Sequence, residues 1–142
     1  MPTKGRASTC RRDGVEEEYL ALAVPAAVTA VWLEELTATH VSKLSTEGNW
    51  WSVYFLSQHA DYRHVALVLA SEPQGKLWER CAYLETMLRY VHDARGRGLA
   101  SAEQIDDARR IVLKESEKLR RRARSERSRS RIAEIGRSAS LM

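Results

Sequence analysis

Arginines dominate one stretch of this 142-residue chain, and their chemistry suits a phosphate. Between residues 114 and 131, nine cationic side chains stand against three glutamates, which leaves a net charge of +6. The cations are Lys114, Lys118, Arg120, Arg121, Arg122, Arg124, Arg127, Arg129 and Arg131. Seven of them are arginine, whose planar fork binds phosphate through two N–H groups and also stacks on bases. The stretch therefore predicts a polyanion-binding site and favours nucleic acid over a tail that only solubilises.

The spacing of these arginines gives them a common face if the stretch is helical. Arg120, Arg124, Arg127 and Arg131 follow one another at steps of four, three and four residues. Eighteen residues at a rise of ~1.5 Å would form a rod of about 27 Å, long enough to meet several phosphates of a duplex groove. The alternative is a chain that becomes ordered only on its partner. In either case we expect affinity to come from phosphates and to fall with salt.

Two serines within the stretch are candidate phosphorylation sites. Ser125 and Ser130 each have an arginine three residues before them, Arg122 and Arg127, a context that basic-directed kinases accept. A phosphate there adds a charge of about −1.5 to −2 among arginines, so it could pair internally and release a polyanion. The same run is also typical of a nuclear import signal.

The elements before this stretch must form the body of the protein. Residues 50–56 (WWSVYFL) and 64–70 (HVALVLA) are short, rich in aromatic and branched side chains, and separated by a polar stretch, which predicts a β-hairpin. Two further helices are the competing interpretation, because short apolar runs are ambiguous by period alone.

Adjacent tryptophans in a strand point to opposite faces. We expect Trp51 to enter the core with Val53 and Phe55, and Trp50 to share the other face with Tyr54, where both rings could stack on bases. The alternative is that both tryptophans lie in the core or in a dimer contact.

Helical periodicity covers most of the remaining chain. A helix is expected from Val15, kinked or restarted at Pro25 and ending at Gly48. A second runs over 76–94, and a third opens with a capping box at Ser101 and Gln104. Their predicted inward positions are Val28, Leu33, Leu36, Val41 and Leu44 in the first, Leu77, Cys81, Leu84, Leu88 and Val91 in the second, and Ile105, Ala108, Val112 and Leu119 in the third. The predicted class is α+β, predominantly α-helical, with the last helix extending into the arginine stretch.

Charge and composition divide the chain into three parts. Residues 1–14 predict a flexible basic arm, 15–119 a single globular domain, and 120–142 an Arg/Ser-rich basic extension. The domain is acidic, with nine cations against fourteen anions over residues 15–113. An acidic body with basic ends is typical of proteins that bind polyanions.

Other kinds of chemistry lack a pattern in this sequence. His59, Asp61 and His64 cluster, but without a cysteine or a second acidic residue at ligand spacing we expect no metal site. No phosphate-binding glycine loop or nucleophile motif occurs, so we expect no cofactor and no catalytic activity. The chain lacks an apolar stretch of the roughly 18 to 20 residues that cross a membrane. We expect an intracellular protein of the cytoplasm, or of the nucleus if the import signal operates.

These patterns predict a small regulator that binds RNA, double-stranded RNA included, through the phosphate backbone. We expect a homodimer through helix 76–94, because Trp78, Met87 and Tyr90 lie partly off its main stripe. A compact body with an arginine-rich tail is similar in layout to small nucleic-acid regulators and to viral accessory proteins that sequester double-stranded RNA. The layout therefore favours an accessory protein of a virus or a mobile element. The alternative is a protein-interaction adaptor whose basic tail serves only import or solubility.

Overall fold

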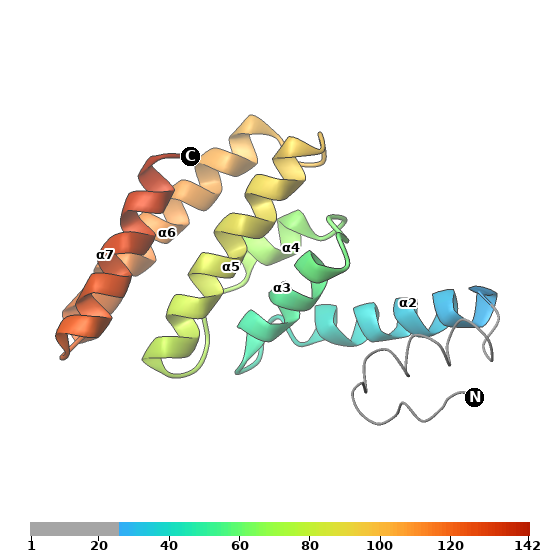
Figure 1. The fold of residues 1–142 in the computed structure, drawn as a ribbon, viewed down its shortest axis with the longest axis horizontal. Coiled ribbons are helices and arrows are strands. Elements are labelled where there is room, and N and C mark those ends of the chain that lie inside the picture. Colours follow the sequence, from blue (N-terminus) through green and yellow to red (C-terminus); the bar gives the residue numbers. More distant parts are fainter. Residues whose placement is uncertain (1–25) are drawn as a thin grey trace, which may run out of the picture. The chain divides into compact units, whose positions relative to one another are not determined.

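The computed structural model describes residues 26–142, which form α-helices without any strand among them (Figure 1). The contacts divide the chain into two units, Met1–Ala38 and Thr39–Met142. The predicted arm 1–14 and the predicted helix start at Val15 lie outside the described residues. The helices of the described part are α2 (Ala26–Ser42), α3 (Asn49–Gln58), α4 (Val65–Ala70), α5 (Leu77–Gly96), α6 (Ala102–Arg122) and α7 (Glu126–Ser140).

The predicted β-hairpin is wrong, and with it the α+β class, whereas the mostly helical character is confirmed. Its two expected strands are α3 and α4. The side chains that α3 buries follow a helical period: Asn49, Ser52, Val53 and Leu56. Two of these residues are polar, so the pattern of apolar residues alone does not show the helical period. They are tolerated inside because Asn49 Nδ2 donates to the carbonyls of Leu44 (2.8 Å) and Glu72 (2.9 Å), while Ser52 Oγ lies 3.2 Å from His40 Nδ1.

The first predicted helix is also corrected. It ends at Ser42, six residues before the expected stop. Gly48 instead precedes α3 in the left-handed region, at φ 77°, where a glycine is favoured. Of the five predicted inward positions only Leu44 is fully buried; Val41 is partly buried, and the three others are exposed: Val28, Leu33 and Leu36.

Helix α5 is central in the second unit and contacts α3, α4, α6 and α7. Its predicted stripe is confirmed, although Leu77 is only partly buried. Met87 and Tyr90 are fully buried, so these two side chains belong to the core and not to the expected dimer surface, whereas Trp78 is exposed. The homodimer itself stays a prediction. Hydroxyl groups join α5 to the chain before it, since Tyr83 donates to the Val68 carbonyl (2.7 Å) and Tyr90 to that of Asp61 (2.5 Å).

Helices α6 and α7 form an antiparallel pair. The predicted capping box is confirmed, because the Gln104 N–H donates to Ser101 Oγ (3.1 Å) and the Ser101 N–H donates to Gln104 Oε1 (3.0 Å). Ala108, Val112 and Leu119 are buried as expected. We expected the packed domain to end at Leu119. In the structure the chain turns back after Arg122, and α7 packs a further apolar stripe into the same core, formed by Ile132, Ile135 and Ala139.

Candidate functional site

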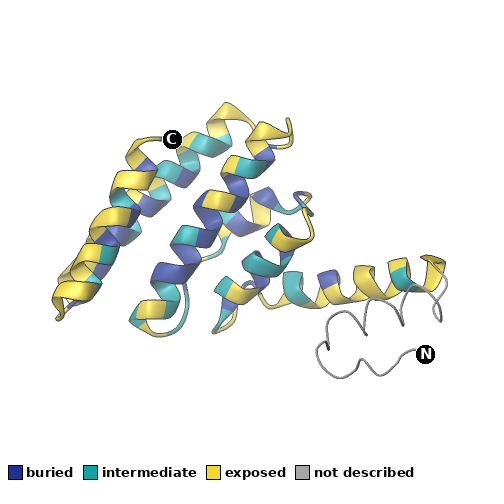
Figure 2. Ribbon diagram, in the orientation of Figure 1, coloured by how far each residue is buried: buried dark blue, intermediate teal, exposed yellow. Residues whose placement is uncertain are grey.

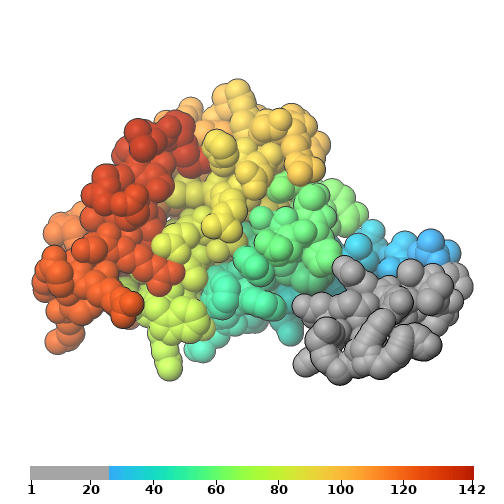
Figure 3. Space-filling model, viewed as in Figure 1, coloured from blue at the N-terminus to red at the C-terminus, as the bar shows by residue number. Residues whose placement is uncertain are grey.

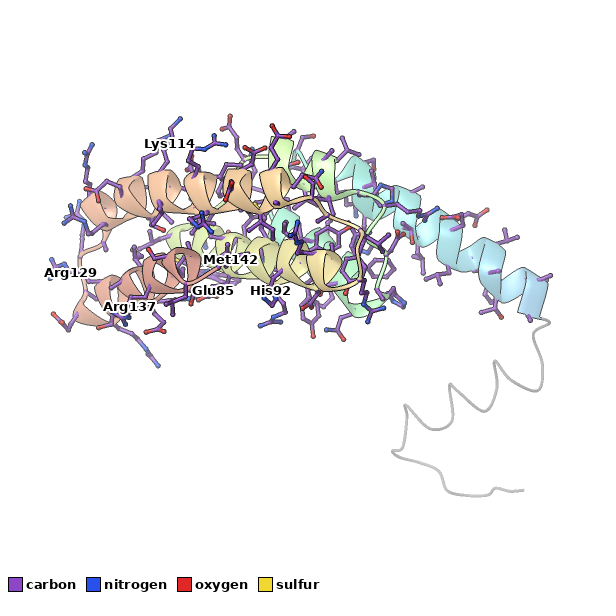
Figure 4. All side chains as sticks on the ribbon, turned by 90° about the horizontal axis from the view of Figure 1, so that it is seen from above. Glu85, His92, Lys114, Arg129, Arg137 and Met142 are labelled. Carbon is purple, nitrogen blue, oxygen red and sulfur yellow. The ribbon has the colours of Figure 1, made fainter. Side chains whose placement is uncertain are left out.

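The arginine stretch is folded into a corner and not into a rod. Helix α6 ends at Arg122, and Ala123, 7% exposed, has extended backbone (ψ 131°) that reverses the chain. The predicted continuous helix of eighteen residues is therefore wrong. We call the segment 121–129 the basic corner; its five arginines are exposed (Figure 2), and Arg129 lies at its outer end in Figure 4. They are Arg121, Arg122, Arg124, Arg127 and Arg129.

Several of the predicted binding cations are occupied by neighbouring carboxylates. Arg120 donates to Glu117, with Nη2 2.5 Å from Oε2, and this hydrogen bond lowers the pKa of Glu117. The same carboxylate lies 3.8 Å from Arg121 Nε, and Lys118 Nζ lies 3.4 Å from Glu115 Oε2. These contacts satisfy part of the charge within α6.

Arg131 faces the body of the protein. It donates twice to Glu85 of α5, from Nε to Oε2 (3.0 Å) and from Nη2 to Oε1 (2.7 Å). The predicted common face of Arg120, Arg124, Arg127 and Arg131 is therefore wrong, because the chain reversal at Ala123 separates Arg120 from the others and Arg131 binds α5.

Four arginines of the basic corner have no partner within the described chain. In the part of the chain that the structure describes, Arg122, Arg124, Arg127 and Arg129 form neither an ion pair nor a side-chain hydrogen bond, and the same holds for Lys114 on α6. Over 122–129 the only acidic residue is Glu126. An unpaired guanidinium needs no internal bond to break before it binds a phosphate.

The two predicted phosphorylation sites differ in setting. Ser125 caps α7, since its Oγ accepts from the Ser128 N–H (3.1 Å) and donates to Ser128 Oγ (2.9 Å). It is exposed in the middle of the basic corner, at the positive end of the α7 dipole. Ser130 is exposed on the second turn of α7.

A group of aromatic rings gathers at the starts of α3 and α5. We call Trp50, Trp51, Tyr54 and Trp78 the aromatic cluster. The Trp50 ring centroid lies 5.4 Å from that of Trp51 and 5.9 Å from that of Trp78, and Trp51 stacks on Tyr54 at 5.4 Å. Trp50 and Tyr54, predicted as stacking residues, are half-buried.

The two most exposed rings of this cluster, Trp51 and Trp78, are not the two that the sequence predicted to stack on bases. Trp51, expected in the core, is 51% exposed, and Trp78, expected in a dimer contact, is 52% exposed. Val53 is buried as expected, and Phe55 is partly buried. Trp78 was detectable as a surface residue, because it falls outside the apolar stripe of its helix.

A groove runs between α5 and α7 on a different part of the same unit. Its acidic groups, Glu85 and Glu134, are paired with Arg131 and Arg137. Figure 4 labels Glu85, His92 and Met142 along it. Its mixed charge does not favour a polyanion. The lining residues are Glu85, Leu88, Arg89, His92, Glu134, Ile135, Ser138, Leu141 and Met142.

The histidine cluster offers no metal centre among residues 26–142. His64 Nε2 lies 3.7 Å from Asp61 Oδ2, and no three His, Cys, Asp or Glu side chains of this region converge on a common point. Hydrogen bonds from Arg63 lower the pKa of Asp61. None of the helices described is both long and apolar enough to cross a membrane.

Comparison of the chain with known protein families, with curated proteins and with solved structures finds no match.

Proposed function

We propose that this protein binds nucleic acid, RNA in preference to DNA, and that the basic corner holds the phosphate backbone. The observation that carries the proposal is the set of four exposed arginines without internal partners within eight residues, Arg122, Arg124, Arg127 and Arg129. Guanidinium groups at a chain reversal can approach neighbouring phosphates from several directions. Arginine also suits this partner better than lysine, because its fork binds two phosphate oxygens at once.

The position of Ser125 suggests regulation of the same surface. A phosphate on its hydroxyl would lie at the α7 N-terminus among the four unpaired arginines, where both the dipole and the charges favour it. It would then compete with the RNA backbone for the same donors.

The proposal is tested by fluorescence-anisotropy titration of the full chain against labelled single-stranded RNA, double-stranded RNA and double-stranded DNA. The test variant replaces the four unpaired arginines by glutamine. A matched control removes four positive charges elsewhere, at Lys43, Arg89, Arg95 and Arg110. We expect the test variant to lose at least tenfold in RNA affinity and the control to lose less than threefold. Equal losses would show only a net-charge effect and would contradict the proposed site.

An adaptor that binds another protein is the second candidate, and the aromatic cluster favours it. Exposed tryptophans are frequent anchors of protein interfaces, and Trp51 and Trp78 are both half-exposed. Salt separates the two functions, because binding to phosphates weakens by orders of magnitude between about 50 and 200 mM salt, whereas an apolar contact barely responds. In this case the basic corner would serve import into the nucleus or solubility.

A further inference from the structure

We propose that Trp78 and Arg127 form a binding place for one unpaired nucleotide, so that the preferred ligand is single-stranded nucleic acid. The inference rests on the proposed function, and it adds the substrate class. Trp78 is the second residue of α5, in its first turn, and half of the twenty residues of that helix are buried. Trp50 contacts the Trp78 ring with interplanar angle 64°, in an edge arrangement that leaves 52% of Trp78 exposed.

The ion pair between Glu85 and Arg131 fixes the register of α5 against α7. Both helices run in the same direction, because α6 returns the chain between them (Figure 1). Trp78 stands seven residues before Glu85, on the same face of α5 and about 10.5 Å nearer the basic corner. Arg127 stands four residues before Arg131, about 6 Å nearer the corner. Along the helix axes Trp78 and Arg127 are thus offset by only about 4.5 Å, both nearer the corner than the ion pair, and an exposed indole stands on this face of α5 in place of a carboxylate.

The figures agree with this register. In Figures 1 and 3, which share one view, the start of α5 and the α6–α7 corner lie at the same end of the second unit. In the described chain Arg127 has no carboxylate partner, and the first acidic residue of α5, Glu79, accepts the Lys76 N–H at 2.8 Å within its own helix cap. Lys76 adds a further exposed cation beside Trp78.

This combination suits an unpaired nucleotide better than a duplex. A base stacks on an indole through its flat face, and that face is hidden between neighbours in a double helix. A base on Trp78 places its own phosphates toward the side where Arg127 and the basic corner lie. Stacking is tolerant of sequence because every base has a flat aromatic face.

The test compares Trp78→Leu with Trp51→Leu in the full chain. The second variant is a matched control, because Trp51 belongs to the same cluster and is 51% exposed. The probes are a labelled twelve-nucleotide oligouridine and a twelve-base-pair RNA duplex, and circular dichroism checks that both variants stay helical. We expect Trp78→Leu to weaken oligouridine binding by about tenfold and duplex binding by less than twofold. We expect Trp51→Leu to change neither by more than twofold.

A second readout is the intrinsic indole fluorescence of the protein. Stacking on a base quenches indole fluorescence, so oligouridine should quench the wild-type protein, and Trp78→Leu should remove most of that quenching. If Trp78→Leu lost the same factor of affinity for oligouridine and for the duplex, or lost affinity for neither, the inference would be overturned. The variant with glutamine at the four corner arginines tests the proposed function separately. The inference would also be overturned if the wild-type chain bound a partner protein through the aromatic cluster and RNA did not displace that partner.

Discussion

Arg131 on α7 and Glu85 on α5 form a two-point ion pair, with nitrogen–oxygen distances of 3.0 and 2.7 Å, between residues 46 positions apart in the chain. Both side chains are about two-fifths exposed. The hydrogen bonds with Glu85 raise the pKa of Arg131. Because Arg131 is paired with Glu85, it is no longer a candidate for binding a phosphate, and it holds α7 against the central helix α5. Arg127 lies on the same face of α7 but has no such partner, so we expect the two arginines to have different roles.

Replacing Arg131 should therefore affect folding more than binding. We expect Arg131→Gln to lower the free energy of unfolding by about 1 kcal/mol, the usual size for a partly exposed two-point pair, and RNA affinity to stay within threefold. Thermal unfolding followed by circular dichroism, with anisotropy on the same samples, measures both. Arg127→Gln is the comparison: it should lower affinity by at least threefold and leave stability unchanged. A loss of affinity in Arg131→Gln together with a loss of stability in Arg127→Gln would contradict the structure.

Negative charge at the α7 cap should release RNA. We expect the combined variant Ser125→Glu, Ser128→Glu and Ser130→Glu to bind RNA about tenfold more weakly, because three carboxylates neutralise the unpaired arginines. Three glutamates at the opposite end of the unit provide the control, at Gln58, Leu99 and Ala102. Unchanged RNA affinity in the combined variant would remove the phosphorylation hypothesis.

The Ser125 hydroxyl should matter for stability by itself. Ser125→Ala removes the acceptor of the Ser128 N–H, and the loss of such a cap costs about 1 kcal/mol. Because no charge changes, RNA affinity should remain within twofold. Urea unfolding of the two proteins measures the first effect; a stability equal to that of the wild type would show that the cap contributes nothing.

Alkaline pH should destabilise the second unit through its buried tyrosines. Burial raises the pKa of Tyr83 and of Tyr90, whereas both titrate near pH 10 in the unfolded chain. A raised folded-state pKa gives stability that is fully present below about pH 10 and is lost above it, as the unfolded chain releases protons that the folded protein retains. We expect the melting temperature to fall between pH 9 and 11. Tyr90→Phe should be less stable at pH 8 but show a smaller fall, and an identical fall would contradict the assignment to Tyr90.

The sequence predicted α5 and α6 well because their inward positions are apolar and regularly spaced. Helix α3 was misread because Asn49 and Ser52 occupy two inward positions, where hydrogen bonds to the carbonyls of Leu44 and Glu72 and to the His40 ring replace apolar contact. Such partners come from other segments, so local pattern cannot supply them.

The break at Ala123 had little local signal. Alanine and arginine favour helix, and neither glycine nor proline interrupts residues 114–131. Ile132 and Ile135 pack into the core and hold α7 beside α5. This packing outweighs the local preference of residues 120–131 for one continuous helix. Ser125 as a helix cap was the one available sign. The candidate binding cations could be named from composition, but their division into paired and unpaired groups depends on Glu85, Glu115 and Glu117.

The salt dependence of RNA binding tests most directly whether the unpaired corner arginines hold the phosphates. For a single strand each phosphate contact contributes about −0.7 to the slope of log affinity against log salt, so four arginines give a slope of about −3. We predict this slope for the wild type and for the charge-matched control, and a slope near zero for the variant with glutamine at Arg122, Arg124, Arg127 and Arg129. Equal slopes for all three proteins would contradict the proposed interface.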